Sequence, residues 1–353
     1  MGLIHPLAKA DVAQALRSAS AEGTSVLVVG GRQHMDRGDP TEAELEMWTT
    51  QLDKIVAYDP AEMIVVVQGG KRMADLAALL AADGQEWPVD APPDATVGGI
   101  IAAGVSSPRR LRVGHVRDTV VEIELVTGDG RLIRSGARTV KNVTGYDVHR
   151  LVTGSLGTLG VIVQAALRVR PLPQTAVTLR AEGDGLTLGR DLLAAVPMAA
   201  GIAATRESVE IRLEGWREEV DELTRLATDA VPELRPLEGS VAFPSSPPWL
   251  EDGIDVVVEA AVPPSRVDEM VEGLDRWTTL IGVGLVWFEL AGDGAPEAVA
   301  QIRRRAEAVG GIAPVIKGPG GRGDTPIPAL EVHRRLKRAF DPAGIMAPGR
   351  LFN

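Results

Sequence analysis

The sequence of 353 residues contains no cysteine. Disulfide bonds, cysteine nucleophiles, and zinc or iron–sulfur sites with thiolate ligands are therefore excluded for this chain. There are five histidines, at positions 5, 34, 115, 149 and 333, and their spacing matches no metal-binding pattern. Aromatic residues make up only 3%, so the core must consist mainly of Val, Leu, Ile and Ala.

The chain also lacks a surplus of positive charge. Its formal net charge is −11, which argues against a surface that binds nucleic acid or anionic membranes. The first residues show no basic segment followed by an apolar run, and no apolar run approaches the roughly 20 residues that cross a bilayer. We therefore expect a cytoplasmic protein without an integral membrane segment, peripheral to a membrane only through partners.

Common nucleotide-binding and hydrolytic motifs are missing as well. The chain contains no G-x-x-x-x-G-K-[ST] loop and no G-x-G-x-x-G that follows a strand and opens a helix. It contains neither G-x-S-x-G nor H-E-x-x-H. The motifs of a P-loop, a Rossmann dinucleotide site, an α/β-hydrolase nucleophile elbow and a zincin are therefore all absent.

What the sequence does contain is an alternation of short apolar runs and helix-like segments. Strands are predicted at 24–31 and 63–70, helices at 9–23 and 72–84, and a hairpin at 119–136 around a Gly-Asp-Gly turn. A short helix at 148–155 and a strand from 159 follow, and prolines 171 and 173 end this region. Residues 95–118 are rich in small side chains and match no regular element.

Beyond residue 174 the pattern predicts an antiparallel sheet with helices, similar to two loosely related β-α-β units. Helices are predicted at 217–230, 265–280 and 297–311, and a basic helix with a Pro/Gly-rich tail begins at 329. A chain of 353 residues is long enough for two domains of ordinary size. The expected class is therefore α+β with two domains.

Three glycine-rich loops fall within the first region. They are Gly30-Gly31 with Arg32, the segment from Thr96 to Gly104, and the segment 154–160. Each can be a plain turn, but successive backbone N–H groups in such loops also form concave sites for phosphate oxygens. Arg32 or Arg109 could then add positive charge for a pyrophosphate.

Several motifs in a fixed order carry a resemblance to a known family. They are ATVGG (95–99), SPRRLRVGHVRD (107–118), VKNVTGYD (140–147), GSLGTLGVI (154–162) and FDPAGIMAPGRL (340–351). Together they resemble FAD-binding proteins of the p-cresol-methylhydroxylase and vanillyl-alcohol-oxidase type, most of all the FAD-binding subunits of bacterial glycolate oxidases (glycolate dehydrogenases). The resemblance implies a two-subdomain FAD-binding domain at 1–173, an α+β cap domain of antiparallel sheet plus helices at 174–325, and a C-terminal segment at 326–353 that returns to the FAD domain.

The resemblance also implies which residues hold the FAD. The glycines of 157–160 would let the backbone pack against the adenine, where a Cβ would intrude, and the loop at 96–99 would follow the pyrophosphate and the ribityl chain. The segment 114–118 would approach the flavin. The full set implied is Gly30, Gly31, Arg32, Gln33, His34, Thr96, Val97, Gly98, Gly99, Gly104, Arg109, Gly114, His115, Asp118, Gly157, Gly160, Val161 and Ile162.

The first glycine loop departs from the family's pattern. The family has an arginine before the two glycines and small residues after them, whereas here Val29 precedes them and Arg32 and Gln33 follow. Arg32 either replaces the missing cation or crowds the phosphates. Some relatives attach FAD covalently through a histidine of this loop, but two residues separate His34 from the glycines. Non-covalent FAD is therefore expected.

The catalytic subunit of the family carries a His-rich metal and substrate motif in its second domain, and this chain has no histidine between 149 and 333. Oxidation of a 2-hydroxy acid needs a base for the hydroxyl proton and a cation for the carboxylate. Arg180, Arg206 and Arg212 could supply charge, but no base is evident, and the catalytic residues stay unknown. The expected function is an FAD-binding subunit beside a catalytic flavoprotein and an iron–sulfur partner. A stand-alone FAD oxidoreductase and an FAD-free scaffold are the alternatives.

Overall fold

The computed structural model describes residues 2–138, 147–238, 243–245, 254–323 and 329–351. The chain forms two compact units. The first comprises Met1–Ser107, His115–Leu172 and Pro326–Asn353, and the second comprises Pro108–Gly114 and Pro173–Thr325. The short stretch Pro108–Gly114, which the sequence analysis placed in the first region, thus clusters with the second unit. Tyr146 and most of the motif at 140–147 lie outside the described residues.

The first unit begins with a small parallel sheet in the order β1-β3-β2, built from Gly2–Ile4, Leu45–Trp48 and Val26–Val29. The predicted helix is α1 (Lys9–Glu22), and it ends at Gly23, whose φ of 71° is the left-handed conformation that glycine adopts easily. Its buried residues Val12 and Leu16 join a cluster that includes Val126 and Val161 of the next sheet. This cluster packs the parallel sheet against the rest of the unit.

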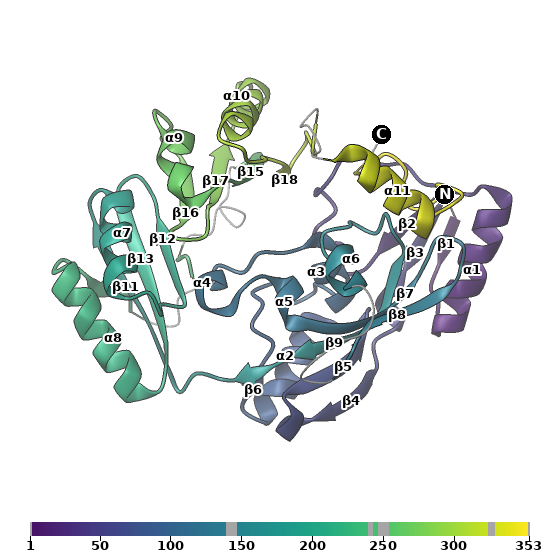
Figure 1. Cartoon of the computed structure of the whole chain (residues 1–353), viewed down its shortest axis with the longest axis horizontal. Coiled ribbons are helices and arrows are strands. Elements are labelled where there is room, and N and C mark those ends of the chain that lie inside the picture. Colours follow the sequence, from purple (N-terminus) through teal and green to yellow (C-terminus); the bar gives the residue numbers. More distant parts are fainter. Residues whose placement is uncertain (1, 139–146, 239–242, 246–253, 324–328, 352–353) are drawn as a thin grey trace. The chain divides into compact units, whose positions relative to one another are not determined.

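The larger sheet of the first unit is antiparallel, in the order β4-β5-β9-β7-β8 (Figure 1). Its strands are Ile55–Asp59, Ile64–Gln68, Val161–Arg168, Val120–Val126 and Leu132–Gly136, which confirms the predicted hairpin at 119–136. The helices α2 (Met73–Ala82) and α6 (Val148–Val152) are also where the sequence predicts them. The short pieces are η1 (Thr49–Gln51), η2 (Pro60–Glu62) and α5 (Val116–Thr119), with β6 (Gln85–Glu86) pairing with β10 (Arg170–Pro171).

A helix that the sequence analysis left unassigned lies inside the segment 95–118. It is α3 (Val97–Ala103), which begins at Thr96 and ends at Gly104, with φ of 64°. The Thr96 hydroxyl caps it by accepting a hydrogen bond from the Gly99 amide at 3.3 Å. Val97, Ile100 and Ile101 are buried in the main core of the unit. Two adjacent glycines lower the helix propensity of this segment, and burial of its apolar residues stabilises the helix.

The C-terminal tail belongs to the first unit. After α11 (Leu330–Phe340), the Val26 amide donates to Ile345 O and the Ala347 amide donates to Val26 O, both at 2.8 Å, so the tail runs beside β2. The Lys337 ammonium donates to Thr158 O at 2.8 Å, Asp341 Oδ2 at 2.7 Å and Met346 O at 2.6 Å. These bonds hold the tail against the parallel sheet and the loop that precedes β9.

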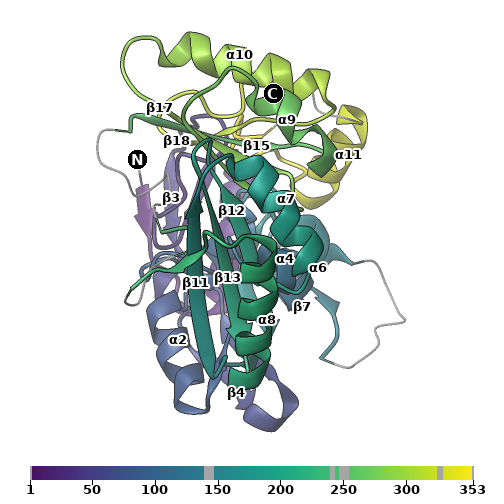
Figure 2. The same cartoon turned by 90° about the vertical axis from the view of Figure 1, so that its left-hand side faces the viewer.

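The second unit is an eight-stranded antiparallel sheet made of two β-α-β-β-α-β halves. The first half consists of β11 (Thr175–Glu182), α7 (Gly185–Ala195), β12 (Gly201–Ala204), β13 (Ser208–Gly215), α8 (Arg217–Ala230) and β14 (Arg235–Pro236). The second half consists of β15 (Val256–Ala261), η3 (Pro264–Arg266), α9 (Val267–Val271), β16 (Trp277–Leu280), β17 (Leu285–Leu290), α10 (Ala295–Ala308) and β18 (Val315–Lys317). The sheet order β14-β11-β13-β12-β16-β17-β15-β18 joins the halves through their second strands. The helices α7 and α8 pack together, α7 on β12 and β13 and α8 on β11 and β13 (Figure 2).

One predicted helix is wrong. The segment 265–280 holds only the five-residue α9, and residues 277–280 form β16 instead. Gly273, with φ of 69°, follows the helix, and β16 pairs with β17 through Trp277↔Phe288 and Thr279↔Val286. Aromatic and β-branched residues favour a strand once a partner strand is present, and the sheet supplies that partner only in the folded chain.

The segment Pro108–Gly114 has contacts that explain its place in the second unit. Its helix α4 (Arg110–Val113) packs on β12, and the Arg112 amide donates to Ala200 O at 3.4 Å. Arg109 forms an ion pair with the buried Glu214 at 3.4 Å, and Arg112 pairs with Glu219 at 3.1 Å. Both units therefore have an α+β fold. The first unit contains parallel and antiparallel sheets, and the main sheet of the second unit is antiparallel.

Candidate functional site

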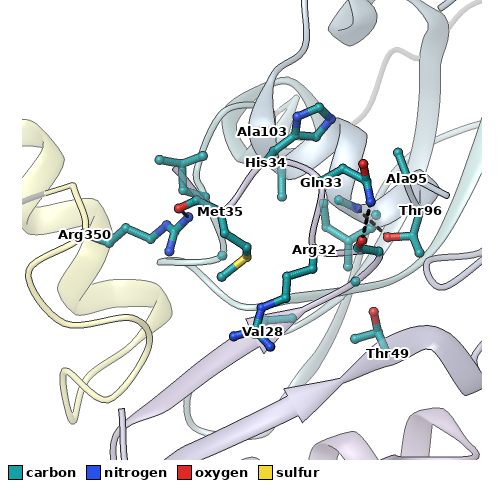
Figure 3. Close-up of a pocket in the computed structure, with 18 of the residues that line it drawn as sticks. Val28, Arg32, Gln33, His34, Met35, Thr49, Ala95, Thr96, Ala103 and Arg350 are labelled. Atoms are coloured by element: carbon teal, nitrogen blue, oxygen red, sulfur yellow. Dashed lines mark hydrogen bonds between the residues drawn. The ribbon is translucent and has the colours of Figure 1, made fainter. Parts of the chain in front are cut away.

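A pocket lies in the first unit (Figure 3). It opens where β2 ends and α3 begins. All three glycine loops predicted from the sequence contribute to it. The lining residues are Val28, Gly30, Gly31, Arg32, Gln33, His34, Met35, Thr49, Ala95, Thr96, Gly98, Gly99, Ala102, Ala103, Leu156, Gly157, Gly160, Ile162 and Arg350.

The two glycines after β2 are required by packing. A Cβ on Gly30 would lie 2.1 Å from Thr96 Oγ1, and a Cβ on Gly31 would lie 1.9 Å from Asp94 O. Real side chains do not tolerate such distances, so only glycine lets this loop rest on the turn before α3. Packing therefore explains why both positions are glycine. Any contact of this loop's glycines with a ligand would come from their backbone amides.

Arg32 occupies a strained position and is already paired. Its φ is 60°, a conformation that favours glycine or asparagine. Its guanidinium lies 3.0 Å from Glu46 Oε1 and 5.3 Å from the centre of the Trp48 ring. Glu46 is 4% exposed and also accepts a hydrogen bond from Trp48 Nε1 at 2.8 Å. Arg32 thus neutralises a buried carboxylate. This role differs from both predictions, in which Arg32 binds the phosphates or crowds them.

The backbone of the same loop offers unused donors. Among the described residues, the amides of Gly31, Arg32 and Gln33 have no hydrogen-bond acceptor, while the Gln33 side chain donates to Gly31 O at 3.0 Å. Consecutive free amides next to a left-handed residue form the concave nest that binds phosphate oxygens. This part of the loop therefore fits an anionic ligand in spite of its unusual side chains.

The first two amides of α3 are not available to a ligand. The Val97 amide donates to Lys71 O at 2.9 Å and the Gly98 amide donates to Gly69 O at 2.7 Å, so both are already used. A Cβ on Gly99 would meet only Thr96 Oγ1, at 3.0 Å, and otherwise points into open space. Because Gly99 lines the pocket, its missing side chain leaves room for a ligand close to the helix.

The third glycine loop forms another part of the pocket wall. Gly157 has φ of 77°, and a Cβ there would approach only Val28, at 3.6 Å. Gly160 has φ of 147°, and a Cβ there would lie 2.4 Å from Val126 O, so packing alone requires it. Ile162 lines the pocket, whereas Val161 is 1% exposed and belongs to the core cluster under α1. The opening residues of β9 thus face alternately toward the pocket and toward the core.

Seven of the predicted residues do not line this pocket. They are Val97, Gly104, Arg109, Gly114, His115, Asp118 and Val161. Two of them form a local cap: His115 Nδ1 accepts from the Arg117 amide, and Asp118 Oδ2 accepts from the His115 amide, both at 3.2 Å. Arg109 and Gly114 lie in the second unit. The eleven others are together in the lining.

Eight residues of the lining were not predicted from the sequence, and Arg350 is the charged one among them. It lies in the tail, is 5% exposed, and donates from Nη2 to Met35 O at 2.8 Å. Its Nε is buried without an acceptor among the described residues, and burial lowers the pKa of the guanidinium while Asp36 opposes that shift. The motif FDPAGIMAPGRL carries the family resemblance, which implies that the tail returns to the FAD domain but assigns no role to its arginine.

The described residues hold no candidate metal cluster, and the arginines considered for substrate binding are engaged in ion pairs. No group of three or more His, Cys, Asp or Glu side chains in the described part of the chain could hold a metal ion. The three arginines proposed for a substrate carboxylate are all paired: Arg180 with Glu182 and Glu210, Arg206 with Asp275, and Arg212 with Glu214. No helix among the described residues is long and apolar enough to span a bilayer.

Comparisons with known proteins agree with the geometry. A family profile described as "FAD binding domain" matches residues 2–136, and one described as "FAD linked oxidases, C-terminal domain" matches residues 326–351. Glycolate oxidase subunit GlcE of Escherichia coli (strain K12) is 32% identical over 312 residues, which cover 84% of each chain. Glycolate oxidase subunit GlcD of Bacillus subtilis (strain 168) is 24% identical and covers 99% of this chain and 88% of its own.

The fold has a close structural counterpart. The structure of an alkyldihydroxyacetonephosphate synthase superposes with a TM-score of 0.73 at 16% identity, over 98% of this chain and 75% of that one. At this identity the likeness shows the fold alone. The relative matched over 84% of each chain at 32% identity, with the two family profiles, shows that this chain belongs to the FAD-linked oxidase family, with an FAD-binding domain of the p-cresol-methylhydroxylase type.

Proposed function

We propose that this chain is the FAD-binding subunit of a glycolate-oxidase-like complex that oxidises a 2-hydroxy acid. The observation that carries the proposal is the pocket of the first unit, where three glycine loops and a row of free amides meet. Its glycolate oxidase relatives are named as subunits, which supports membership of a complex. In this reading the first unit binds FAD and the second is the cap.

The residues present fit FAD held without a covalent bond. The amides of 31–33 would form a nest that donates hydrogen bonds to the pyrophosphate oxygens. The absence of side chains at Gly99 and Gly157 leaves room for flat or bulky groups. Ile162 and Leu156 would supply apolar contact. When bound, FAD supplies an acceptor for two electrons from the substrate or from a partner.

Catalysis by the chain alone is not supported by its side chains. A 2-hydroxy acid needs a cation for its carboxylate and a base for its hydroxyl proton, and the arginines considered for the first role are engaged in ion pairs. We therefore assign the chemistry to a separate catalytic flavoprotein subunit. An iron–sulfur subunit would carry electrons onward, since a chain without cysteine provides no thiolates for clusters.

A visible spectrum of the purified chain, followed by turnover assays, tests this function. We expect flavin absorbance, release of FAD on denaturation, and no useful oxidation of glycolate or lactate with an artificial acceptor. Affinity purification of the tagged chain from its native cells should then recover a second flavoprotein and an iron–sulfur protein. Robust turnover by the chain alone would establish a stand-alone oxidoreductase, and a colourless protein that rejects added FAD would establish a scaffold.

A further inference from the structure

Arg350 stands out among the charged side chains of the first unit because it is buried and incompletely paired. It is 5% exposed and its Nε has no acceptor among the described residues. Its side-chain hydrogen bond to a described residue, from Nη2 to Met35 O at 2.8 Å, satisfies one of five N–H groups. No carboxylate of the described residues approaches its nitrogens within 4.0 Å, and Asp36 acts only from farther away.

Such a group is costly unless something compensates it. A buried charge without a partner loses its hydration, and an unsatisfied buried donor loses the hydrogen bonds it would make to water. The other arginine of the lining, Arg32, is paired with Glu46, whereas Arg350 keeps its charge available. Both the fold of the tail and the position of β2 bring this free charge into the pocket wall (Figure 3).

We propose that Arg350 is the phosphate-binding cation of this pocket, with its guanidinium taking an oxygen of the ligand's phosphate groups. The assignment of that ligand as FAD rests on the proposed function, but the chemistry needed is that of any phosphate-bearing adenine nucleotide. A phosphate supplies both the missing charge and the missing acceptor, and an arginine–phosphate pair is among the stronger hydrogen bonds. The arginine that the family places before the loop glycines is thereby replaced from the other end of the chain.

The test compares Arg350→Gln with Arg350→Lys and with the matched control Arg338→Gln. Arg338 lies on α11 of the same unit, pairs with Glu331 on the surface and does not line the pocket. The flavin-free chain is titrated by calorimetry with FAD, ADP and adenosine, and the thermal unfolding of each variant is recorded with and without ADP. ADP and adenosine share the base and ribose, so their difference isolates the phosphates.

We expect Arg350→Gln to weaken FAD and ADP by about 10- to 100-fold while adenosine binding stays unchanged. Arg350→Lys keeps the charge without Nε and should weaken ADP by at least about threefold, which gives a second measure if the glutamine variant does not fold. Without ligand, the glutamine variant should be at least as stable as the parent, because an uncompensated buried charge is removed. The control should change none of these values.

Each remaining outcome decides the matter. Parental ADP binding in both Arg350 variants, or a glutamine variant that only loses stability, would show that Arg350 merely supports Met35, and would overturn the inference. If the parent binds ADP but not FAD and Arg350→Gln removes the ADP, the inference stands and the flavin function fails. If the parent binds neither FAD nor ADP, both are refuted.

Discussion

Two adjacent glycines of α3 allow packing and ligand binding to be separated. A Cβ on Gly98 would lie 2.9 Å from Gly69 O, a backbone atom that is itself held by a hydrogen bond. A Cβ on Gly99 would meet only the Thr96 hydroxyl, at 3.0 Å, and otherwise faces the pocket. The same substitution to alanine should therefore have opposite consequences one residue apart.

The magnitudes follow from these surroundings. Gly98→Ala should lower the free energy of unfolding by about 1–3 kcal/mol, because the backbone at Gly69, after β5, must move away from the new methyl group. Gly99→Ala should leave it unchanged or raise it by up to ~1 kcal/mol, since alanine favours the helix and a side-chain oxygen can shift. If FAD lies against α3, the Gly99 methyl group should cost about 1–3 kcal/mol of binding, or roughly 10- to 100-fold, and valine should cost more.

Urea unfolding of the flavin-free protein and titration of flavin fluorescence measure the two effects separately. The placement of the ligand is refuted if Gly99→Val folds and retains full FAD affinity. Loss of stability in Gly99→Ala equal to that in Gly98→Ala would instead show that the open space beside Gly99 is filled by protein. Gly294→Ala is a suitable control, since its Cβ would meet nothing within 4 Å and it lies outside the pocket.

Two further predictions concern stability. Lys337→Met should lower the free energy of unfolding by about 3 kcal/mol in urea titrations. Asp341, which is 1% exposed, would lose its cation, and the carbonyl groups of Thr158 and Met346 would lose their donor. An unchanged midpoint would mean that the tail is held by its backbone hydrogen bonds alone. Burial lowers the pKa of His149, whose Nδ1 has no partner among the described residues. The imidazole therefore binds a proton less readily in the folded state than in the unfolded state, and stability should fall as pH drops below ~6.5. His149→Gln should flatten the pH dependence between about pH 7 and pH 5 in the same assay, and an unaltered slope in that variant would assign the effect to other groups.

Much of the fold was predictable because local patterns and tertiary structure agree. Alternation and the Gly-Asp-Gly turn predict the hairpin of β7 and β8, and apolar spacing with a glycine end predicts α1. The motifs of the tail predict its return to the first unit, where its backbone pairs with β2. The family resemblance also predicts that three distant glycine loops meet, and eleven of the predicted residues line one pocket.

Several features depended on contacts that no local pattern contains. The strand at 277–280 exists because β17 pairs with it, and α3 exists because its apolar face is buried. The sequence by itself determined the class of the chain, most of its elements and the three glycine loops that line the pocket. The tertiary structure alone decided which glycines are held by packing, that Arg32 is used by Glu46, and that Arg350 reaches the carbonyl oxygen of Met35. The physical reason is that pairing, burial and open space are properties of neighbours in space, and Arg350 and Met35 are 315 residues apart along the chain.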